Sequence, residues 1–178
     1  MSEQLSRISK LFVDRDQTDA EAALLRRRGH TVVLKCGDDV ASSYTLQLAV
    51  LTAARIASRC FPGAVEVEIS DHLDAAPLLL WPTTAQSIGA ALQEAGARRA
   101  LDAEGTTLLF GDKAAGATGM RVTFDGWIAR VGPASMLARP PEREFFSAAG
   151  VLGAALAMSE VFLAFAEMNV AATRRVVG

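Results

Sequence analysis

Apolar residues recur along the chain with two spacings, one typical of buried strands and one typical of packed helices. Residues 31–35 (TVVLK) are β-branched and apolar, which predicts an inner strand of a sheet that is covered on both faces. Residues 42–60 follow helical spacing with Ser42 or Ser43 as the N-cap, and residues 61–70 (FPGAVEVEIS) supply a turn and a second strand. This order predicts a β-α-β unit with parallel strands and a right-handed crossover.

The middle of the chain continues the alternation of strands and helices. Residues 78–81 (LLLW) predict a short third strand that ends at a proline. Residues 83–102 predict a helix with Thr83 or Thr84 as its N-cap. Residues 106–112 (TTLLFGD) then predict another strand, which leads into a glycine-rich turn.

The last third of the chain adds a hairpin and a long apolar helix. Residues 120–132 predict two strands joined at Asp125-Gly126, a dipeptide typical of β-hairpins. Residues 145–168 are rich in alanine and glycine but contain Glu160, which favours a helix packed on the sheet over a membrane span. The whole pattern predicts an α/β fold, a Rossmann-like three-layer sandwich with a mainly parallel sheet and a late antiparallel hairpin.

The first thirty residues differ from the rest because they contain no strand pattern. Their apolar positions are compatible with two helical stretches that are broken near residues 14–19. The sequence RRRGH ends the second stretch, because cations are favoured at a helix C-terminus and Gly29 can terminate it. We therefore expect an N-terminal helical segment, 1–30, and one compact Rossmann-like domain, 31–178, as the N-terminal part of a longer polypeptide.

Composition narrows the class of protein. With 178 residues, 51% of them hydrophobic and 21% charged, the chain is long enough to bury one core, and its net charge of -2 gives no general attraction to nucleic acid. Cys36 and Cys60 make neither a disulfide framework nor a zinc site, and the N-terminus lacks a secretory signal. We expect a cytoplasmic protein with neither nucleic-acid nor membrane partners.

The turn after the first strand, KCGDDVASSY, lies where α/β proteins hold nucleotides. Such loops use two or three glycines to turn tightly and to bring the backbone close to phosphate. Here Gly37 stands alone, and Asp38 and Asp39 place carboxylates where phosphate oxygens would lie. Ser42 and Ser43 could still offer hydroxyl or backbone N–H groups to an anion. These residues are therefore candidate ligand contacts, with a purely structural helix start as the alternative interpretation.

Two further positions are expected at the same edge of the sheet. Glu68 and Asp71 follow the second strand, where an acidic residue holds ribose hydroxyls in nucleotide folds, although both lie beyond the usual distance of about 20 residues from the loop. Asp112 and Lys113 follow the later strand, and Lys113 could meet a phosphate or a carboxylate. The alternative interpretation is an ordinary surface turn.

The remaining polar and aromatic candidates give no motif. His30 and His72 lie in no metal-ligand spacing and beside no evident nucleophile, so the sequence predicts no metal site and identifies no catalytic residue. Trp81 and Trp127 are core residues by default, but an exposed tryptophan at the hairpin would be an anchor for a partner.

Taken in order, several segments resemble the adenylyltransferase domain of ThiF-type, ubiquitin-activating-enzyme-like proteins. They are the strand-glycine-helix at 32–56, the sequence GMRVTFDGWIARVGP, and the helix AAGVLGAALAMSEVFLAFAE. In that family a strand similar to RVTFDGWIARVGP precedes a helix that begins with an element like GVLG at 150–153. The resemblance covers most of the chain after His30.

The chain departs from the active members of that family at their chemical positions. Active members use a multi-glycine loop for ATP, an aspartate after the second strand, an arginine and a lysine nearby, an aspartate for magnesium, and often paired cysteines for zinc. This chain has one loop glycine and no cysteine pair, and Asp112 and Lys113 are the nearest substitutes. The resemblance therefore implies a degenerate, non-catalytic domain of the kind that pairs with an active half.

Three hypotheses follow. The first is a ThiF-like pseudoenzyme without a cofactor, which acts as an interaction or scaffold unit for a catalytic domain of the same chain or for another protein, a homodimer being the alternative assembly. The second is an adenylyltransferase that uses ATP and magnesium to activate a carboxylate, with magnesium on Asp38 or Asp112 and phosphate on Lys113. The third, a dinucleotide-binding oxidoreductase, is disfavoured because a pyrophosphate would face Asp38 and Asp39.

Overall fold

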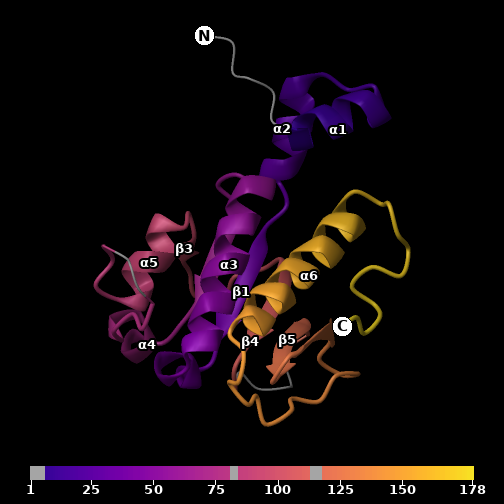
Figure 1. Cartoon of the computed structure of the whole chain (residues 1–178). Coiled ribbons are helices and arrows are strands. Elements are labelled where there is room, and N and C mark those ends of the chain that lie inside the picture. Colours follow the sequence, from indigo (N-terminus) through magenta and orange to yellow (C-terminus); the bar gives the residue numbers. More distant parts are fainter. Residues whose placement is uncertain (1–6, 81–83, 113–117) are drawn as a thin grey trace.

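A six-stranded sheet runs through the centre of the molecule (Figure 1). The computed structural model describes residues 7–80, 84–112 and 118–178. The sheet order is β3-β2-β1-β4-β5-β6, with the first five strands parallel and β6 antiparallel to β5. The predicted Rossmann-like α/β fold with a late antiparallel hairpin is therefore confirmed. The strands are β1 (Val32–Cys36), β2 (Val65–Glu68), β3 (Arg98–Arg99), β4 (Thr106–Phe110), β5 (Met120–Asp125) and β6 (Ile128–Pro133).

Helices α3 (Tyr44–Cys60) and α6 (Ala148–Phe165) lie side by side over one face of the sheet (Figure 1). They pack closely because small residues, among them Ala49, Ala53, Ala154 and Ala157, fill the contact and are fully buried. Ser43 caps the first of them by accepting a hydrogen bond from Leu46 N (3.0 Å), which confirms one of the two predicted caps. The helices are α1 (Arg7–Asp16), α2 (Ala20–Arg28), α3 (Tyr44–Cys60), α4 (Asp71–Ala75), α5 (Ile88–Glu94) and α6 (Ala148–Phe165), with a 3-10 turn η1 (Asp38–Ser42).

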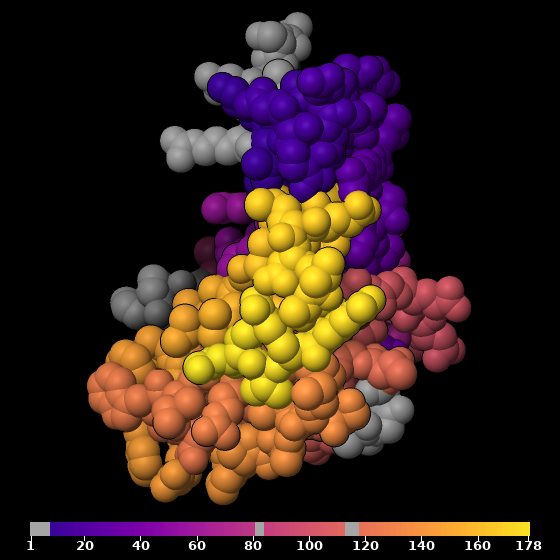
Figure 2. Space-filling view, turned by 90° about the vertical axis from the view of Figure 1, so that its right-hand side faces the viewer, coloured from indigo at the N-terminus to yellow at the C-terminus, as the bar shows by residue number. Residues whose placement is uncertain are grey.

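Helix α6 is the apolar segment that the sequence predicted to be a helix packed on the sheet. Among the described residues it is the helix with the length and hydropathy of a membrane span, and it packs against α3, β5 and β6. Its buried Glu160 accepts hydrogen bonds from Arg175 Nη2 (2.8 Å) and Thr173 N (3.0 Å), which fixes the C-terminal tail to the helix. The tail then pairs Val177 with Val131 on the outer edge of β6, and Figure 2 shows it lying along the surface between the N-terminal helices and the β5–β6 region.

One predicted element is wrong, and another is shorter than predicted. Within the described residues 78–80 there is no strand, because this segment is held to α3 by the buried Gln47, whose Oε1 accepts a hydrogen bond from Leu79 N (2.8 Å). The strand beyond β2 is instead the two-residue β3. The helix predicted over 83–102 is confirmed in part as the shorter α5, which Ser87 caps in place of Thr84 and which ends before Gly96 at a φ of 93°; Thr83 lies outside the described residues. Helix α4 was not predicted.

The N-terminal helices form a hairpin that caps the ends of α3 and α6. The predicted break lies between α1 and α2, where Asp19 is the N-cap, and Gly29 ends α2. Arg27 is only 2% exposed and donates to the carbonyl oxygens of Arg59 and Cys60 at the end of α3, both at 2.7 Å. Arg26 and Arg15 donate to the carbonyl oxygens of Phe165 and Ala166 at the end of α6. These arginines therefore satisfy the C-termini of two other helices, a role that the RRRGH pattern did not reveal.

Candidate functional site

The candidate site lies where the chain changes direction across the sheet. After β1 the chain continues to β2 on one side, and after β3 it returns to β4 on the other side of β1. The carboxyl ends of β1 and β4 therefore adjoin at the topological switch point, the position at which open α/β sheets bind ligands. Gly37 N donates to Phe110 O (3.0 Å), so the turns that follow these strands begin in direct contact.

The two glycines at this point make room for carboxylates. A Cβ on Gly37 would overlap with Asp112 Oδ1, and a Cβ on Gly111 would overlap with Asp39 Oδ1. Gly37 has an ordinary φ of -77°, so it is required for space alone, whereas Gly111 has a φ of 68° as well. The lone loop glycine thus accommodates the Asp112 carboxylate from the neighbouring turn.

Asp39 is the centre of the hydrogen-bond network at the switch point. Its Oδ1 accepts a hydrogen bond from Asp112 N (2.9 Å), and its Oδ2 accepts one from Arg139 Nη2. The same Arg139 nitrogen also donates to Glu142 Oε2, and Glu142 Oε1 accepts from Thr123 Oγ1 on β5 (2.6 Å). This network ties η1, β5 and the connector before α6 together.

Sequence analysis missed Arg139, Glu142 and Thr123. Arg139 and Glu142 lie in the proline-rich connector, and their spacing of three residues was the available signal, since an acid and a base at that spacing can pair. The partner Asp39 lies a hundred residues earlier, and no local pattern connects it to them. The fold alone brings the connector over the switch point.

The electrostatics of the cluster are dominated by like charge. Partial burial and the neighbouring Asp39 carboxylate raise the pKa of Asp112 above its ordinary value, while Arg139 acts in the opposite direction. Asp38 adds a further negative charge, and its Oδ1 accepts a hydrogen bond from Ser70 Oγ (2.5 Å) at the start of α4. A surplus of negative charge therefore surrounds the point at which a nucleotide phosphate would enter.

The two loop serines are engaged in structural contacts. Ser42 Oγ donates to Asp39 O (3.2 Å) within the 3-10 turn. Ser43 caps α3 and donates its hydroxyl proton to Glu144 Oε1 in the connector. Both aspartates lie in the 3-10 turn that precedes α3, so the structural helix start that was the alternative interpretation describes their local geometry.

The two ribose candidates have partners of their own. Glu68 accepts from Lys35 Nζ on β1 (2.9 Å) and from Ala103 N (2.9 Å). Asp71, at the exposed start of α4, pairs with Arg99 Nη2 of β3 at 2.5 Å. Neither carboxylate is joined to Asp39 by a hydrogen bond or an ion pair among the described residues.

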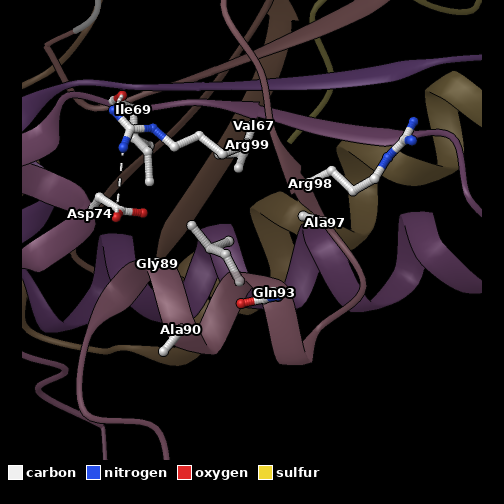
Figure 3. A pocket seen from close by; sticks show the side chains of 10 residues that line it. Val67, Ile69, Asp74, Gly89, Ala90, Gln93, Ala97, Arg98 and Arg99 are labelled. Atoms are coloured by element: carbon white, nitrogen blue, oxygen red, sulfur yellow. Dashed lines mark hydrogen bonds and ion pairs between the residues drawn. The ribbon is translucent and has the colours of Figure 1, made fainter.

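A cavity of about 440 Å³ lies between α5 and the β2–β3 edge of the sheet (Figure 3). In this view Arg99 reaches toward Asp74, 3.7 Å away, while Arg98 extends to the other side. The Arg99 guanidinium also donates to Ile69 O (3.3 Å) and to Asp71. Its donors are therefore directed at groups of the chain itself. The lining residues are Val67, Ile69, Asp74, Gly89, Ala90, Leu92, Gln93, Ala97, Arg98 and Arg99.

The remaining candidates are the two histidines, the two tryptophans and Lys113, and the structure does not bring them together in one site. His30 lies between Phe61 and Phe165, with ring centroids 4.8 Å from each, and burial lowers its pKa. Trp127 is 70% exposed and stacks on Phe146 with a centroid distance of 3.9 Å, so the hairpin tryptophan is a surface residue. His72 lies in α4, far in sequence from both His30 and Trp127. Lys113 and Trp81 lie outside the described residues.

The residues at the switch point do not fit ATP and magnesium as the family's active members hold them. The space beside Gly37 is filled by Asp112, and the Arg139 donor nearest to the loop is shared between two carboxylates. In the parts of the chain that the structure describes, no group of three or more His, Cys, Asp or Glu residues is arranged to hold a metal ion.

The fold and the site together define a Rossmann-like α/β domain with carboxylates at its switch point. Comparison with known families matches residues 31–178 to the family described as BilD N-terminal domain, and the chain belongs to this family. It is similar to the bacterial E1-like protein BilD of Collimonas sp. (strain OK412), with 31% identity over 180 residues. The aligned part is 98% of this chain but only 38% of that protein. No solved structure matches the chain.

These matches show that the chain is related to E1-like proteins. The resemblance to ThiF-type proteins is confirmed to that extent.

Proposed function

We propose that this chain is a non-catalytic E1-like domain that acts as an interaction or scaffold unit for a catalytic domain of the same polypeptide. The observation that carries the proposal is the position of the Asp39 carboxylate. It lies at the switch point, held by Asp112 N and by Arg139. An E1-like domain that bound ATP would bring phosphate to this end of the sheet.

The charge at this point opposes a phosphate. A phosphate oxygen about 4 Å from one carboxylate is repelled by about 4 kcal/mol at an effective dielectric constant of 20. Asp38 and Asp112 add to the repulsion by Asp39. Arg139 could offset it, but its Nη2 already serves Asp39 and Glu142. We infer that the domain works without a nucleotide cofactor.

The same end of the molecule carries an exposed aromatic patch, which we define as Trp127, Ile128, Phe145 and Phe146. Trp127 and Phe145 are 70% and 73% exposed, and the stack of Trp127 on Phe146 holds both rings in place. Exposed, ordered aromatic side chains are the usual anchors of protein interfaces. Because the related BilD protein is much longer than this chain, we propose that the patch contacts a catalytic domain of the full polypeptide.

Calorimetric titration with ATP, ADP and NAD, with and without magnesium, tests the first part of the proposal. The natural chain should show no saturable binding, and Asp39→Gly should gain affinity because the central carboxylate is removed. Asp102→Gly is the matched control, since Asp102 is exposed and has a φ of 53° that glycine accepts readily. Micromolar binding of ATP with magnesium by the natural chain would contradict the proposal.

Hydrogen exchange tests the second part. In the full polypeptide the backbone amides of 126–128 and 143–147 should exchange more slowly than in the isolated domain. Trp127→Ser together with Phe145→Ser should remove that difference, whereas Leu101→Ser, at another exposed apolar residue, should not. Equal exchange in the full polypeptide and in the isolated domain would rule out an interface at the patch.

A further inference from the structure

Arg121 is a buried arginine in the middle of β5. It is only 5% exposed, and it lies beside Leu109 of β4 and opposite Gly132 of β6. Its neighbours Met120 and Val122 belong to the core beneath α3 and α6. Because alternate residues of a strand point to opposite faces, Arg121 faces the other side of the sheet, which we call the back face.

The guanidinium of Arg121 has no partner in residues 7–80, 84–112 and 118–178. Its Nε is buried without a hydrogen-bond acceptor, and no carboxylate lies within ion-pair distance. The buried Arg27 and Glu160, in contrast, are satisfied, Arg27 by carbonyl oxygens and Glu160 by Arg175. A guanidinium stays protonated in proteins, and its buried Nε–H lacks the acceptor that a buried donor normally has. Arg121 therefore requires an explanation beyond packing.

The surroundings of Arg121 on the back face contain both positive and negative groups. Thr123 is two residues along the same strand and pairs across the hairpin with Arg130, so both residues share the back face with Arg121. Arg130 is exposed and has no ion pair in the described part of the chain. Glu142 is the nearby acid, but Thr123 and Arg139 occupy its two oxygens. The back face of the hairpin thus has two arginines that form no ion pair in the described residues, although Arg130 acts electrostatically on the Asp125 carboxylate.

A small cleft of about 70 Å³ lies beside these arginines. It is lined by Thr123, Phe124, Asp125, Ile128, Arg130 and Pro140. Arg121 is not one of these lining residues; it lies two residues from Thr123 on the same face, about 6.5 Å along the strand, a span that an arginine side chain can bridge. Asp125, at the upper end, is already held by Arg143 Nε and Nη2 at 2.7 Å each. The cleft is too small for a nucleotide but large enough for a single oxyanion group.

We propose that this cleft binds one oxyanion, a carboxylate or phosphate group of a small molecule, with Arg130 contacting it from the rim and Arg121 from the floor. Guanidinium groups are suited to both chemistries because they donate two parallel hydrogen bonds. The site shares Ile128 with the aromatic patch and Thr123 with the hydrogen-bond network of Arg139 and Asp39. It would exist whether or not the domain binds a nucleotide.

Thermal unfolding of the full chain in sodium phosphate, sodium acetate and sodium chloride at matched ionic strength tests the proposal. Phosphate or acetate should raise the melting temperature in a saturable way beyond chloride, and the more effective anion identifies the group. Arg121→Met should weaken this effect at least about tenfold, as expected when a charge-assisted hydrogen bond is lost. Arg98→Met, at an exposed arginine of the opposite sheet edge, is the matched control and should leave the effect unchanged.

A second measurement keeps the test decisive. Without added anion, Arg121→Met should melt at a higher temperature than the natural chain, because it removes a buried donor that has no acceptor. Arg121→Lys keeps the charge but loses the paired donors, so it should reduce the anion effect if Arg121→Met does not fold. Equal shifts in all three anions, an effect of ionic strength only, would overturn the proposal, as would anion shifts that survive both substitutions or a lower melting temperature of Arg121→Met.

Discussion

The two ends of the sheet are held by opposite charges. At the amino end Arg15, Arg26 and Arg27 donate to backbone carbonyls at the ends of α3 and α6. At the carboxyl end Asp39 shares the single Arg139 nitrogen with Glu142, and further carboxylates lie nearby. The arginines at the amino end meet the negative ends of helix dipoles, while the carboxylates at the carboxyl end compete for one cation. The amino end thus pairs its arginines with carbonyl oxygens, whereas like charges gather at the carboxyl end, where related folds bind ligands.

Removing Arg27 should give the largest effect, because it breaks the amino end. Arg27→Met loses donors to Arg59 O, Cys60 O and Ser9 Oγ, all at 2.7 Å, and leaves buried acceptors unsatisfied. We expect the free energy of unfolding to fall by about 3 kcal/mol, measured by urea denaturation. The exposed neighbour Arg28 is the control, since Arg28→Met should change stability by less than about 0.5 kcal/mol. Equal losses from both substitutions would mean that the capping contacts contribute little.

Removing Arg139 should give a smaller loss at the carboxyl end and reveal its coupling to Asp39. Arg139→Ala should lower the free energy of unfolding by about 1–2 kcal/mol, because Glu142 is buried and loses its cation. In a double-mutant cycle with Asp39→Ala, we expect a coupling energy of about 1 kcal/mol. The exposed Arg143–Asp125 pair is the control and should couple by less than about 0.5 kcal/mol. Additive losses at Arg139 and Asp39 would show that their contact is not an effective ion pair.

The difference between the two ends also explains what the sequence could predict. The strand, glycine and helix around β1 are local patterns, so the sheet, the hairpin at Asp125 and the position of the loop were predictable. The contacts of the arginines at the amino end and of the carboxylates at the carboxyl end join residues that are far apart in the sequence. Arg27 meets Cys60 and Asp39 meets Arg139 across 33 and 100 residues, respectively. Sequence analysis found the carboxylates of the site but could not find the arginine that holds them.

The elements that differ from the prediction are explained by a tertiary hydrogen bond in one place and by a backbone turn in the other. Apolar residues at 78–80 suggested a strand, but the buried amide of Gln47 holds Leu79 N and draws the segment onto α3. Helix α5 ends where Gly96 adopts a left-handed conformation, and the residues beyond it join the sheet edge as β3. In both places a tertiary hydrogen bond or a backbone turn outweighed the local apolar pattern.

The two ends should respond to acid with opposite signs, which is the smallest expected effect. Burial lowers the pKa of His30, so the folded state binds fewer protons than the unfolded state, and stability falls as the pH drops through 6.5 toward the lowered value. Burial and Asp39 raise the pKa of Asp112, so the folded state binds more protons, and stability is gained as the pH falls through that raised value toward 3.8. His30→Phe should flatten the loss below pH 6.5. Asp112→Asn should raise stability at pH 7 and remove the gain near pH 4.

Urea denaturation midpoints between pH 4 and 8 would measure both slopes. Each effect should stay below about 1 kcal/mol, because Asp112 is largely exposed and His30 is only partly buried. Leu101→Ser, which changes an exposed side chain without a titratable group, is the control and should leave both slopes unchanged. If Asp112→Asn lowered stability at pH 7, the Asp112 carboxylate would be stabilising the turn, and the like-charge tension assigned to the carboxyl end would be absent. Opposite slopes, in contrast, would show that one sheet has a proton-excluding end, where His30 is buried against aromatic rings, and a proton-attracting end, where Asp112 lies beside Asp39.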